Sequence, residues 1–256
     1  MNIIGIIPAR MASSRFPGKP LAEICGIPMV GHVYFRSKLS KTLHEVYVAT
    51  CDKEIADYIK SIGGKAIMTS DTHERASDRT AEAMLKIEKE TRRKVDIVVM
   101  IQGDEPMICP EMIEKAVKPM FGDKNILITN LMAELKNEKE FEDPNEVKVV
   151  VDKFNNALYF SREPIPSRKK GAKNIPMLKQ VCVIPFRRDF LIQYNSTEPT
   201  PLEIIESVDM MRILENGLKV KMIPTKYVSK SVDTKEDLNY VEGLMKKDVL
   251  IKDYCK

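Results

Sequence analysis

Apolar and polar positions follow two alternating patterns along the first half of the chain. Short apolar runs rich in β-branched residues are separated by longer amphipathic stretches, which is typical of βαβ units around a largely parallel sheet. The short runs predict strands at Ile3–Ile7, Val46–Thr50, Lys65–Met68, Asp96–Ile101 and Ile126–Leu131. The longer stretches predict helices at Met29–Ser40, Lys53–Ile62, Ser77–Glu90 and Pro110–Met120, the last with a proline suited to a first helical turn.

The pattern changes after about Glu142. Strand-like runs now follow one another at Val147–Val151, Ala157–Ser161 and Lys179–Phe186, with the basic segment Ser167–Lys173 between the last two. Helical patterns at Pro201–Asn216 and Lys235–Lys247 come next, separated by a strand-like run at Lys219–Ile223. We therefore expect a single α/β domain over residues 1–256. Its mostly parallel sheet would be flanked by helices and would carry an inserted mixed or antiparallel lobe at roughly 143–200, a candidate acceptor or dimer surface.

Composition is that of an ordinary globular protein. Hydrophobic residues make up 43% of the 256 positions and charged residues 30%, which argues against collagen-like, coiled-coil and disordered classes. Forty-one Lys and Arg against 37 Asp and Glu give a net charge of +4. That balance is too slight to indicate nucleic-acid binding, so any basic function must be local.

Neither a targeting segment nor a membrane segment is predicted. The apolar run at the start has no basic region before it and is cut short by Pro8 and Arg10. No stretch approaches the ~20 apolar residues that a membrane helix needs. The five cysteines are scattered and form no CxxC pair, which favours neither a disulfide framework nor a zinc site. We expect a cytoplasmic protein with no membrane insertion.

The segment after the first predicted strand, Pro8 to Pro20, is rich in cations. Arg10, Arg15 and Lys19 accompany two serines, and Gly18 permits close approach of the backbone. A P-loop is excluded, because that motif needs Gly at position 13 and Ser or Thr at position 20, where this chain has Ser13 and Pro20. Composition alone fits a solvated basic turn equally well. The place directly after a buried strand favours phosphate binding.

Carboxylates follow the fourth predicted strand, in Gln102-Gly103-Asp104-Glu105-Pro106. A carboxylate at this strand end would face the same cleft as the basic loop, and beside a triphosphate it is best explained by Mg²⁺ held between Asp104 and phosphate oxygens. The alternative is that Asp104 and Glu105 cap the helix that begins near Pro110. Asp233, in Val232-Asp233-Thr234, precedes a helix and fits either a site or an N-cap.

Taken together, several segments are far more specific than any one of them. The chain resembles the Kdo (3-deoxy-manno-octulosonate) cytidylyltransferase, or CMP-Kdo synthetase, family of CTP-dependent acidic-sugar nucleotidyltransferases. The resemblance rests first on Pro8-Ala9-Arg10, Pro17-Gly18-Lys19-Pro20-Leu21, Gln102-Gly103-Asp104-Glu105-Pro106 and Val232-Asp233-Thr234. It extends along nearly the whole chain through Asp143-Pro144-Asn145, Val147-Lys148-Val149-Val150, Tyr159-Phe160-Ser161-Arg162, Pro164-Ile165-Pro166, Arg187-Arg188-Asp189-Phe190-Leu191 and Leu214-Glu215-Asn216-Gly217.

The resemblance implies a Rossmann-like nucleotidyltransferase, usually a homodimer, that joins CTP to a 2-keto sugar acid and releases pyrophosphate. It implies catalytic roles for Arg10, Lys19 and Asp104, and Mg²⁺ held by Asp104 and Asp233. The implied nucleotide-binding residues are Ala9, Arg10, Ser13, Arg15, Lys19, Arg79 and Gln102. The implied acceptor-binding residues are Gln102, Arg162, Gln180, Glu203 and Glu206.

Two segments depart from the family pattern. Arg75-Ala76-Ser77-Asp78-Arg79 stands where the family typically has Ser-Gly-Thr-Asp-Arg, and Gln180-Val181-Cys182-Val183-Ile184 where it has His-Ile-Gly-Ile-Tyr. The second change removes an imidazole and a phenol expected near the sugar. Another acidic acceptor, such as an amino-Kdo, a nonulosonate or a phosphonate, therefore stays open. A non-catalytic nucleotide-binding regulator is the remaining alternative, and the presence of both Asp104 and Asp233 argues against it.

Overall fold

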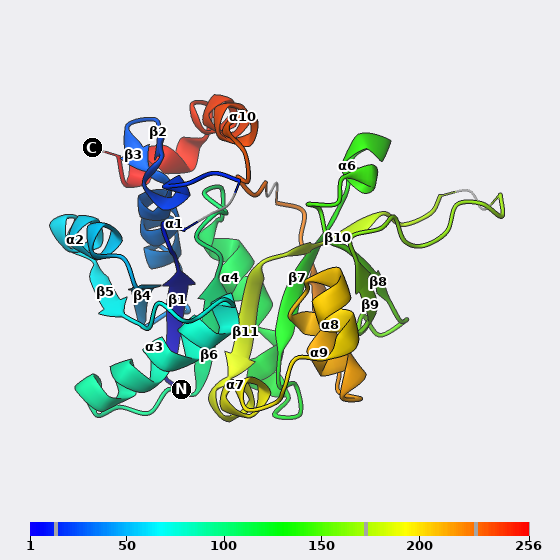
Figure 1. Cartoon of the computed structure of the whole chain (residues 1–256), viewed down its shortest axis with the longest axis horizontal. Helices are drawn as coiled ribbons and strands as arrows, with labels where there is room; N and C mark the ends of the chain where they lie inside the picture. The colour runs from blue at the N-terminus through cyan, green and yellow to red at the C-terminus, as the bar shows by residue number, and fades with distance from the viewer. Residues whose placement is uncertain (13–14, 172–173, 228–229, 256) are drawn as a thin grey trace.

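A computed structural model describes residues 1–12, 15–171, 174–227 and 230–255. The chain forms two sheets that lie side by side, each with its own helices (Figure 1). None of the helices in the described part of the chain is both long enough and apolar enough to cross a membrane.

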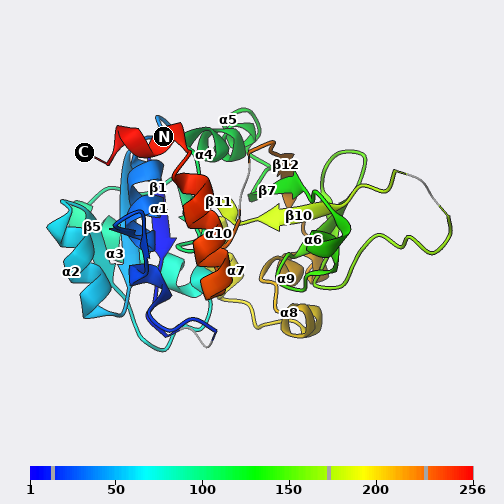
Figure 2. The same ribbon diagram turned by 90° about the horizontal axis from the view of Figure 1, so that it is seen from above.

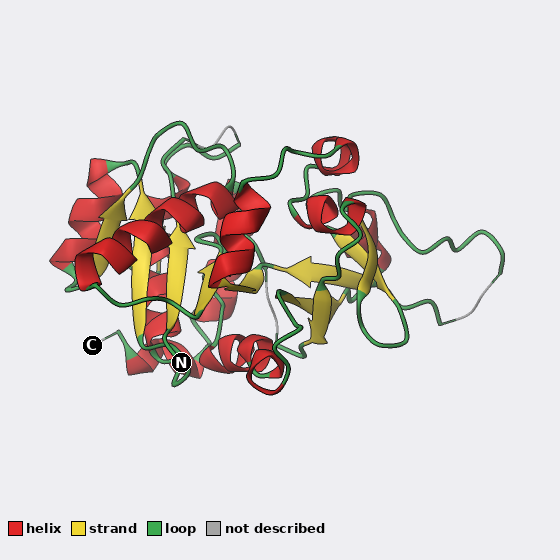
Figure 3. Cartoon of the chain, turned by 90° about the horizontal axis from the view of Figure 1, so that it is seen from below, coloured by secondary structure: helices red, strands yellow, loops and turns green. Residues whose placement is uncertain are grey.

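The first sheet has the order β11-β6-β1-β4-β5. Its strands are β1 (Ile3–Pro8), β4 (Glu45–Thr50), β5 (Lys65–Met68), β6 (Ile97–Ile101) and β11 (Val183–Arg187). Neighbouring strands run parallel except β11, which is antiparallel to β6. Helices cover both faces (Figures 2 and 3): α1 (Met29–Lys38), α2 (Lys53–Ser61), α3 (Ala76–Thr91), α4 (Pro110–Val117), α5 (Pro119–Gly122) and α7 (Arg188–Asn195).

The alternation of side chains along β1 explains the two helical layers. Ile4 and Ile6 belong to the core that contains α3 and α7, whereas Ile3 and Ile7 belong to the core that contains α1, α2 and α4. Successive side chains of a strand point to opposite faces, so a central strand in such a sheet must be apolar on both. All six residues of β1 are buried.

The second sheet has the order β12-β7-β10-β8-β9. Its strands are β7 (Thr129–Glu134), β8 (Lys148–Val151), β9 (Ala157–Ser161), β10 (Leu178–Val181) and β12 (Lys221–Pro224). β12 is parallel to β7, and the other pairs are antiparallel. The associated helices are α6 (Glu138–Glu142), α8 (Pro201–Glu206) and α9 (Met210–Glu215). This mixed sheet takes in β7 and β12, which lie outside the 143–200 range expected for the insertion.

The C-terminal helix returns to the first sheet. α10 (Lys235–Met245) packs on the hairpin of β2 (Glu23–Ile24) and β3 (Ile27–Pro28), and two 3₁₀ turns span Lys19–Leu21 and Val249–Asp253. Val232, Val241 and Met245 are fully buried here against Ile24 and Met29. Burial of each such side chain contributes about 1.5–3 kcal/mol. This packing fixes the segment before α10 beside the first sheet.

The fold class expected from the sequence is confirmed: an α/β protein with a mostly parallel main sheet and a second, mixed lobe. The expected strands Lys65–Met68 and Ala157–Ser161 match β5 and β9 residue for residue. The single strand expected at Lys179–Phe186 is two strands, because the chain passes from the second sheet to the first at Cys182. The helix expected at Pro201–Asn216 is likewise two helices, α8 and α9, separated at Ser207, which has a positive φ of 51°.

Candidate active site

A cleft of about 470 Å³ lies where the two sheets meet. The loops after β1 and β6 form one wall, and the start of α3 forms another. Residues of the second lobe close it, including Val147, Arg162 and Gln180. Gly103 lets the loops after β1 and β6 lie close together, since a Cβ there would be 3.0 Å from the carbonyl oxygen of Pro8. The ends of β1 and β6, which sequence analysis predicted to carry the site, therefore do face one cavity.

The loop after β1 is held in shape by hydrogen bonds from its backbone N–H groups. The N–H of Ala9 donates to the carbonyl of Ala49 at 2.9 Å, and the N–H of Met11 donates to the Asp52 carboxylate at 2.7 Å. Gly18, with a positive φ of 74°, turns the chain so that its N–H reaches the Met11 carbonyl at 3.1 Å. Ala9, Arg10 and Arg15 line the cleft, whereas Ser13 lies outside the described residues.

Lys19 lies between the two carboxylates that the sequence assigned to a metal. Its Nζ is 2.8 Å from Oδ2 of Asp104 and 3.3 Å from Oδ1 of Asp233. Burial lowers the pKa of the Lys19 ammonium, but Asp104 and Asp233 outweigh burial and raise the pKa above its ordinary value. The backbone N–H of Val232 donates to the carbonyl of Asp104 at 3.0 Å, which ties the segment before α10 to the loop after β6.

The donor set fits Mg²⁺ bound together with a nucleotide. No group of three or more His, Cys, Asp or Glu side chains within the described residues is arranged to hold a metal alone. Mg²⁺ is usually held by one or two carboxylates together with substrate phosphates and waters. Asp104 and Asp233 meet that requirement once a triphosphate supplies the remaining oxygens.

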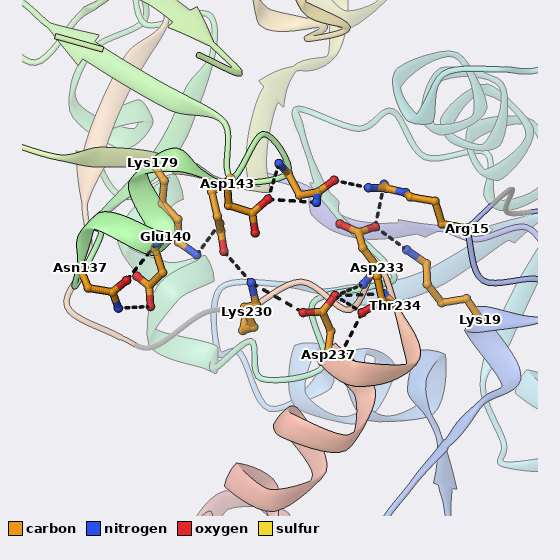
Figure 4. A network of polar contacts seen from close by, with 12 residues as sticks. Arg15, Lys19, Asn137, Glu140, Asp143, Lys179, Lys230, Asp233, Thr234 and Asp237 are labelled. Atoms are coloured by element: carbon orange, nitrogen blue, oxygen red, sulfur yellow. Dashed lines mark hydrogen bonds and ion pairs between the residues drawn. The ribbon is translucent and has the colours of Figure 1, made fainter. Parts of the chain in front are cut away.

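Arg15 reaches across the cleft from the loop after β1. Its guanidinium lies 2.9 Å from the Asp233 carboxylate, and it also donates to the side-chain oxygen of Asn145 on the second lobe (Figure 4). The Arg15 side chain is 53% exposed, so these contacts contribute little to stability. These contacts instead set positions, because the Arg15 side chain links the loop after β1 to the loop before α10 and to the second lobe.

Arg79 is almost completely buried, although it contributes to the cleft lining. Its guanidinium donates to the Thr69 hydroxyl and to the carbonyls of Ser70 and His73. In this arrangement Arg79 fixes the 69–73 segment beside the cleft. His73 also lines the cleft, and its Nε2 is 2.5 Å from the Glu82 carboxylate.

On the second lobe, Arg162 is held by carbonyl groups. Its guanidinium donates to the carbonyls of Glu206 at 2.8 Å, Pro144 at 2.8 Å and Ser207 at 3.2 Å. No ion pair involves Arg162 within the described part of the chain, so its charge is available to an acidic ligand. The Glu206 carboxylate in turn accepts from the Arg162 N–H at 2.9 Å and from the Ser161 hydroxyl at 2.9 Å.

Two glutamines face the cleft close to the crossing point between the sheets. The Gln180 amide donates to Oδ1 of Asn130 at 2.6 Å, and the Asn130 amide donates to the carbonyl of Val181 at 2.6 Å. The backbone N–H of Gln102 donates to the carbonyl of Cys182 at 3.2 Å. Both glutamines line the cleft, so the structure brings them together with Arg162.

Glu203 lies elsewhere, which corrects its expected place in the acceptor pocket. Its carboxylate is buried in a two-pronged ion pair with Arg212, at 2.6 and 2.7 Å, and completes the capping box of α8 with Thr200. The described residues that line the cleft include Arg162 but neither Glu203 nor Glu206. Glu206 contacts Arg162, a cleft residue, in two ways: its carboxylate accepts from the Arg162 backbone N–H, and its carbonyl accepts from the Arg162 guanidinium.

Two carboxylates of the cleft lining, Glu74 and Asp209, were missed by sequence reasoning. Asp209 accepts from the Ser77 hydroxyl at 3.0 Å and lies 3.2 Å from the Arg75 guanidinium. Burial raises its pKa, and the cations Arg75 and Arg212 and the Ser77 hydrogen bond offset that only in part. The only available signal was its place three residues after Glu206. Its partner Arg75 belongs to one of the two segments that depart from the family pattern.

Comparisons with known proteins agree with this geometry. Residues 4–223 match the cytidylyltransferase family model. The chain is 42% identical over 251 residues to 3-deoxy-manno-octulosonate cytidylyltransferase of Geobacter metallireducens, which covers 94% of this chain and 96% of that protein. It is also 42% identical over 247 residues to the mitochondrial 3-deoxy-manno-octulosonate cytidylyltransferase of Arabidopsis thaliana, covering 96% and 83% of the two chains.

A solved structure gives the same picture. CMP:2-keto-3-deoxy-manno-octonic acid synthetase complexed with CTP has a TM-score of 0.88 to this chain at 37% identity, covering 96% of this chain and 99% of that one. A shared fold alone does not establish function. Sequence identity of this extent over nearly the whole length does establish descent, so the chain is a cytidylyltransferase and belongs to the 3-deoxy-manno-octulosonate cytidylyltransferase family.

Proposed function

We propose that this enzyme joins CTP to Kdo, forming CMP-Kdo and pyrophosphate. The anomeric hydroxyl of Kdo attacks the α-phosphorus of CTP; the new P–O bond forms as the bond to the β-phosphate oxygen breaks, and the hydroxyl proton is lost to solvent. The observation that carries the proposal is the contact of Lys19 with both Asp104 and Asp233. It lies at the carboxyl edge of a parallel sheet, where nucleotides bind in folds of this kind.

The loop after β1 supplies the positive charge for the triphosphate. Arg10, Arg15 and Lys19 would neutralise the phosphates, and Ala9, whose N–H is held by the Ala49 carbonyl, lines the cleft beside them. Charge builds up on pyrophosphate as it leaves, so Arg10 and Lys19 act more strongly in the transition state than in the ground state. A role for Ser13 in closing this loop remains part of the proposal.

Asp104 and Asp233 would hold Mg²⁺, which supplies charge neutralisation and alignment of the phosphates when bound. The protein's own contribution is to keep the two carboxylates on one side of the cleft. Lys19 balances part of their charge before the substrate arrives. No side-chain nucleophile is needed for this reaction.

The acceptor would bind against the second lobe. Arg162, whose guanidinium is oriented by three carbonyls, pairs with the sugar carboxylate. Gln102 and Gln180 offer amide groups to the sugar hydroxyls, and Glu206 orients Arg162. Arg79 serves the nucleotide side indirectly, because its hydrogen bonds hold the segment that carries His73.

A second acceptor of the same class is favoured by Gln180 and Asp209. One N–H of the Gln180 amide is engaged by Asn130, and its carbonyl oxygen can accept a hydrogen bond from the acceptor. A carbonyl and the Asp209 carboxylate both accept hydrogen bonds, and both would tolerate an amino group in place of a hydroxyl. An amino-Kdo is therefore the leading alternative to Kdo.

We propose that the enzyme works as a homodimer in the cytoplasm. Large apolar side chains of the second lobe are exposed, notably Phe154, Leu158, Ile204 and Ile205. Leu158 lies on β9, an edge strand, and exposed edges tend to be covered by pairing or packing. All five cysteines are free, which fits a reducing compartment.

The proposal is tested by pyrophosphate release with CTP, Mg²⁺ and a panel of acids. Release with Kdo, together with a product of the mass of CMP-Kdo, is the expected result. Release only with a nonulosonate or a phosphonate would overturn Kdo as the acceptor. CTP binding without release for any acid would instead indicate a nucleotide-binding regulator.

A further inference from the structure

A buried glutamate lies between two lysines beside the active site. Glu146, just before β8, has a side chain only 6% exposed. Its carboxylate oxygens lie 2.9 Å from Nζ of Lys179 on β10 and 2.9 Å from Nζ of Lys230. A buried carboxylate is costly unless it is paired and hydrogen-bonded, and these two lysines meet that requirement.

Lys230 connects this carboxylate to the loop that carries Asp233. Its Nζ lies 3.8 Å from Oδ1 of Asp237, in the first turn of α10. The other carboxylate oxygen of Asp237 accepts from the backbone N–H groups of Asp233 at 3.2 Å and Thr234 at 3.0 Å. Figure 4 shows the resulting line of contacts from Lys179 through Lys230 and Asp237 to Asp233.

The loop is thus held from both lobes. From the first lobe, the N–H of Val232 donates to the Asp104 carbonyl, and Val232 is buried under α10. From the second lobe, the contact runs through Lys230 to Glu146.

The segment around Glu146 also positions the acceptor side of the cleft. Lys148, two residues on, donates from Nζ to the carbonyls of Asp143 and Arg162. The carbonyl of Pro144 accepts from the Arg162 guanidinium. Residues 143–148 therefore hold Arg162 directly and reach Asp233 through Lys230.

We infer that Lys230 is a positioning residue, which sets the Asp233 carboxylate against Asp104 and holds the acceptor lobe in register with the metal site. This inference rests on the proposed role of Asp233 as a metal ligand. Contacts that orient a metal ligand are worth about 10- to 100-fold in metal affinity when removed. A loss of metal affinity of this size would distinguish a residue that positions the metal ligand from one whose ion pair only stabilises the fold.

The test compares Lys230→Met with Lys230→Arg and with Arg188→Met in the full chain. Arg188 is a matched control: its side chain is 23% exposed, as is that of Lys230, and it pairs with Glu88 on the body of α3. Mn²⁺ binding in the presence of CTP is measured by electron paramagnetic resonance, alongside kcat, the KM for Mg²⁺ and thermal unfolding. We expect Lys230→Met to weaken Mn²⁺ binding about 10- to 100-fold and to raise the KM for Mg²⁺. Lys230→Arg should keep Mn²⁺ binding and the KM for Mg²⁺ close to those of the parent. Arg188→Met should change only thermal unfolding.

A second comparison tests whether Lys230 acts through Glu146. In a Glu146→Gln background, Lys230→Met should change Mn²⁺ binding far less than in the parent, because the contact is already weakened. An equal effect in both backgrounds, or unchanged Mn²⁺ binding in Lys230→Met, overturns the inference. If Asp233→Asn loses Mn²⁺ binding and Lys230→Met does not, the positioning role of Lys230 is wrong but the metal site stands. If both variants keep Mn²⁺ binding, the assignment of Asp233 as a metal ligand is wrong as well.

Discussion

Nζ of Lys19 lies 2.8 Å from Oδ2 of Asp104, although the two residues are 85 positions apart in the chain. The same ammonium also reaches Asp233, so one positive charge is shared by two carboxylates. Arg15 also pairs with Asp233, so two cations balance the two carboxylates before a substrate arrives. We expect Lys19 to exchange these carboxylates for phosphate oxygens when CTP arrives with Mg²⁺.

Replacing either metal carboxylate should abolish most turnover. Asp104→Asn and Asp233→Asn are expected to lower kcat by orders of magnitude with little change in thermal unfolding, because the lost interaction acts mainly in the transition state. Asp57→Asn, at an exposed position of α2, is the control and should retain full turnover. Normal kcat in both active-site variants would contradict the assignment.

Removing the shared ammonium should affect both binding and chemistry. Lys19→Met is expected to weaken CTP binding and to reduce kcat about 10²- to 10³-fold, the usual effect of losing a donor to developing charge. CTP binding should also become less sensitive to salt, since one phosphate contact is gone. The measurement is the CTP Kd at several salt concentrations. A salt dependence identical to that of the parent enzyme would favour a solvated basic turn.

The strand ends of the first sheet could be predicted from sequence because buried parallel strands are continuous apolar runs. The predicted carboxyl ends of β1 and β6 were enough to predict that the basic loop and Asp104 share one cleft. The split of Lys179–Phe186 into β10 and β11 could not be predicted, because alternation reports burial but does not tell which sheet buries a residue.

Polar pairs that depend on tertiary packing were the other part of the site that the sequence could not predict. Glu203 has the residue type and neighbourhood of an acceptor ligand, yet its buried pair with Arg212 depends on how α8 meets α9. Asp209 lines the cleft and contacts Ser77 and Arg75, which are more than 130 positions away in the chain. Tertiary packing decides which partners such side chains have, and the local sequence pattern carries no information about it.

Acid should weaken the segment beside the cleft through Glu82. Burial raises the pKa of this carboxyl, but hydrogen bonds from Lys86, from the Ser70 N–H and from His73 outweigh burial and lower the pKa to about 2. A depressed folded-state pKa means that the stabilisation is fully present above the ordinary value of 4.5 and is lost as the pH falls through about 2.

Glu82→Gln should therefore cost about 1–3 kcal/mol of unfolding free energy at pH 7. Urea denaturation at pH 7, 4.5 and 3 measures the difference between the variant and the parent. The difference should shrink as the pH falls below about 4.5. A difference that stays constant with pH would show that the carboxylate charge is not what stabilises this segment.

The exposed apolar face of α8 predicts an assembly defect. Ile204 and Ile205 are 62% and 73% exposed, and a double change to Glu would place two charges in any interface formed there. Sedimentation velocity should show a dimer for the parent and a monomer for Ile204→Glu/Ile205→Glu. Val249→Glu, at a side chain 76% exposed on the other lobe, should leave the dimer intact. A dimer retained by the double variant would place the interface elsewhere.

The acceptor should be distinguished by the hydrogen-bonding groups near Gln180. One N–H of its amide donates to Asn130 at 2.6 Å, and its carbonyl oxygen can accept from a substrate. Sites built to pair a substrate polar group discriminate strongly against analogues that cannot make that pair. We expect Kdo and an amino-Kdo both to react. The kcat/KM ratio of amino-Kdo to Kdo should be higher with Gln at position 180 than with His. Gln180→His should lower the kcat/KM ratio of amino-Kdo to Kdo.

The comparison uses kcat/KM for Kdo, an amino-Kdo and a nonulosonate in one assay, for the parent enzyme and Gln180→His. Arg162→Met in the same series should depress kcat/KM for all three acids, because each presents a carboxylate to the same guanidinium. A uniform loss in Arg162→Met with a selective change in Gln180→His would separate carboxylate binding from hydroxyl selection. If Kdo is strongly preferred by the parent and Gln180→His leaves every ratio unchanged, position 180 serves only the packing of β10, and selection of the sugar must come from the opposite wall at Asp209.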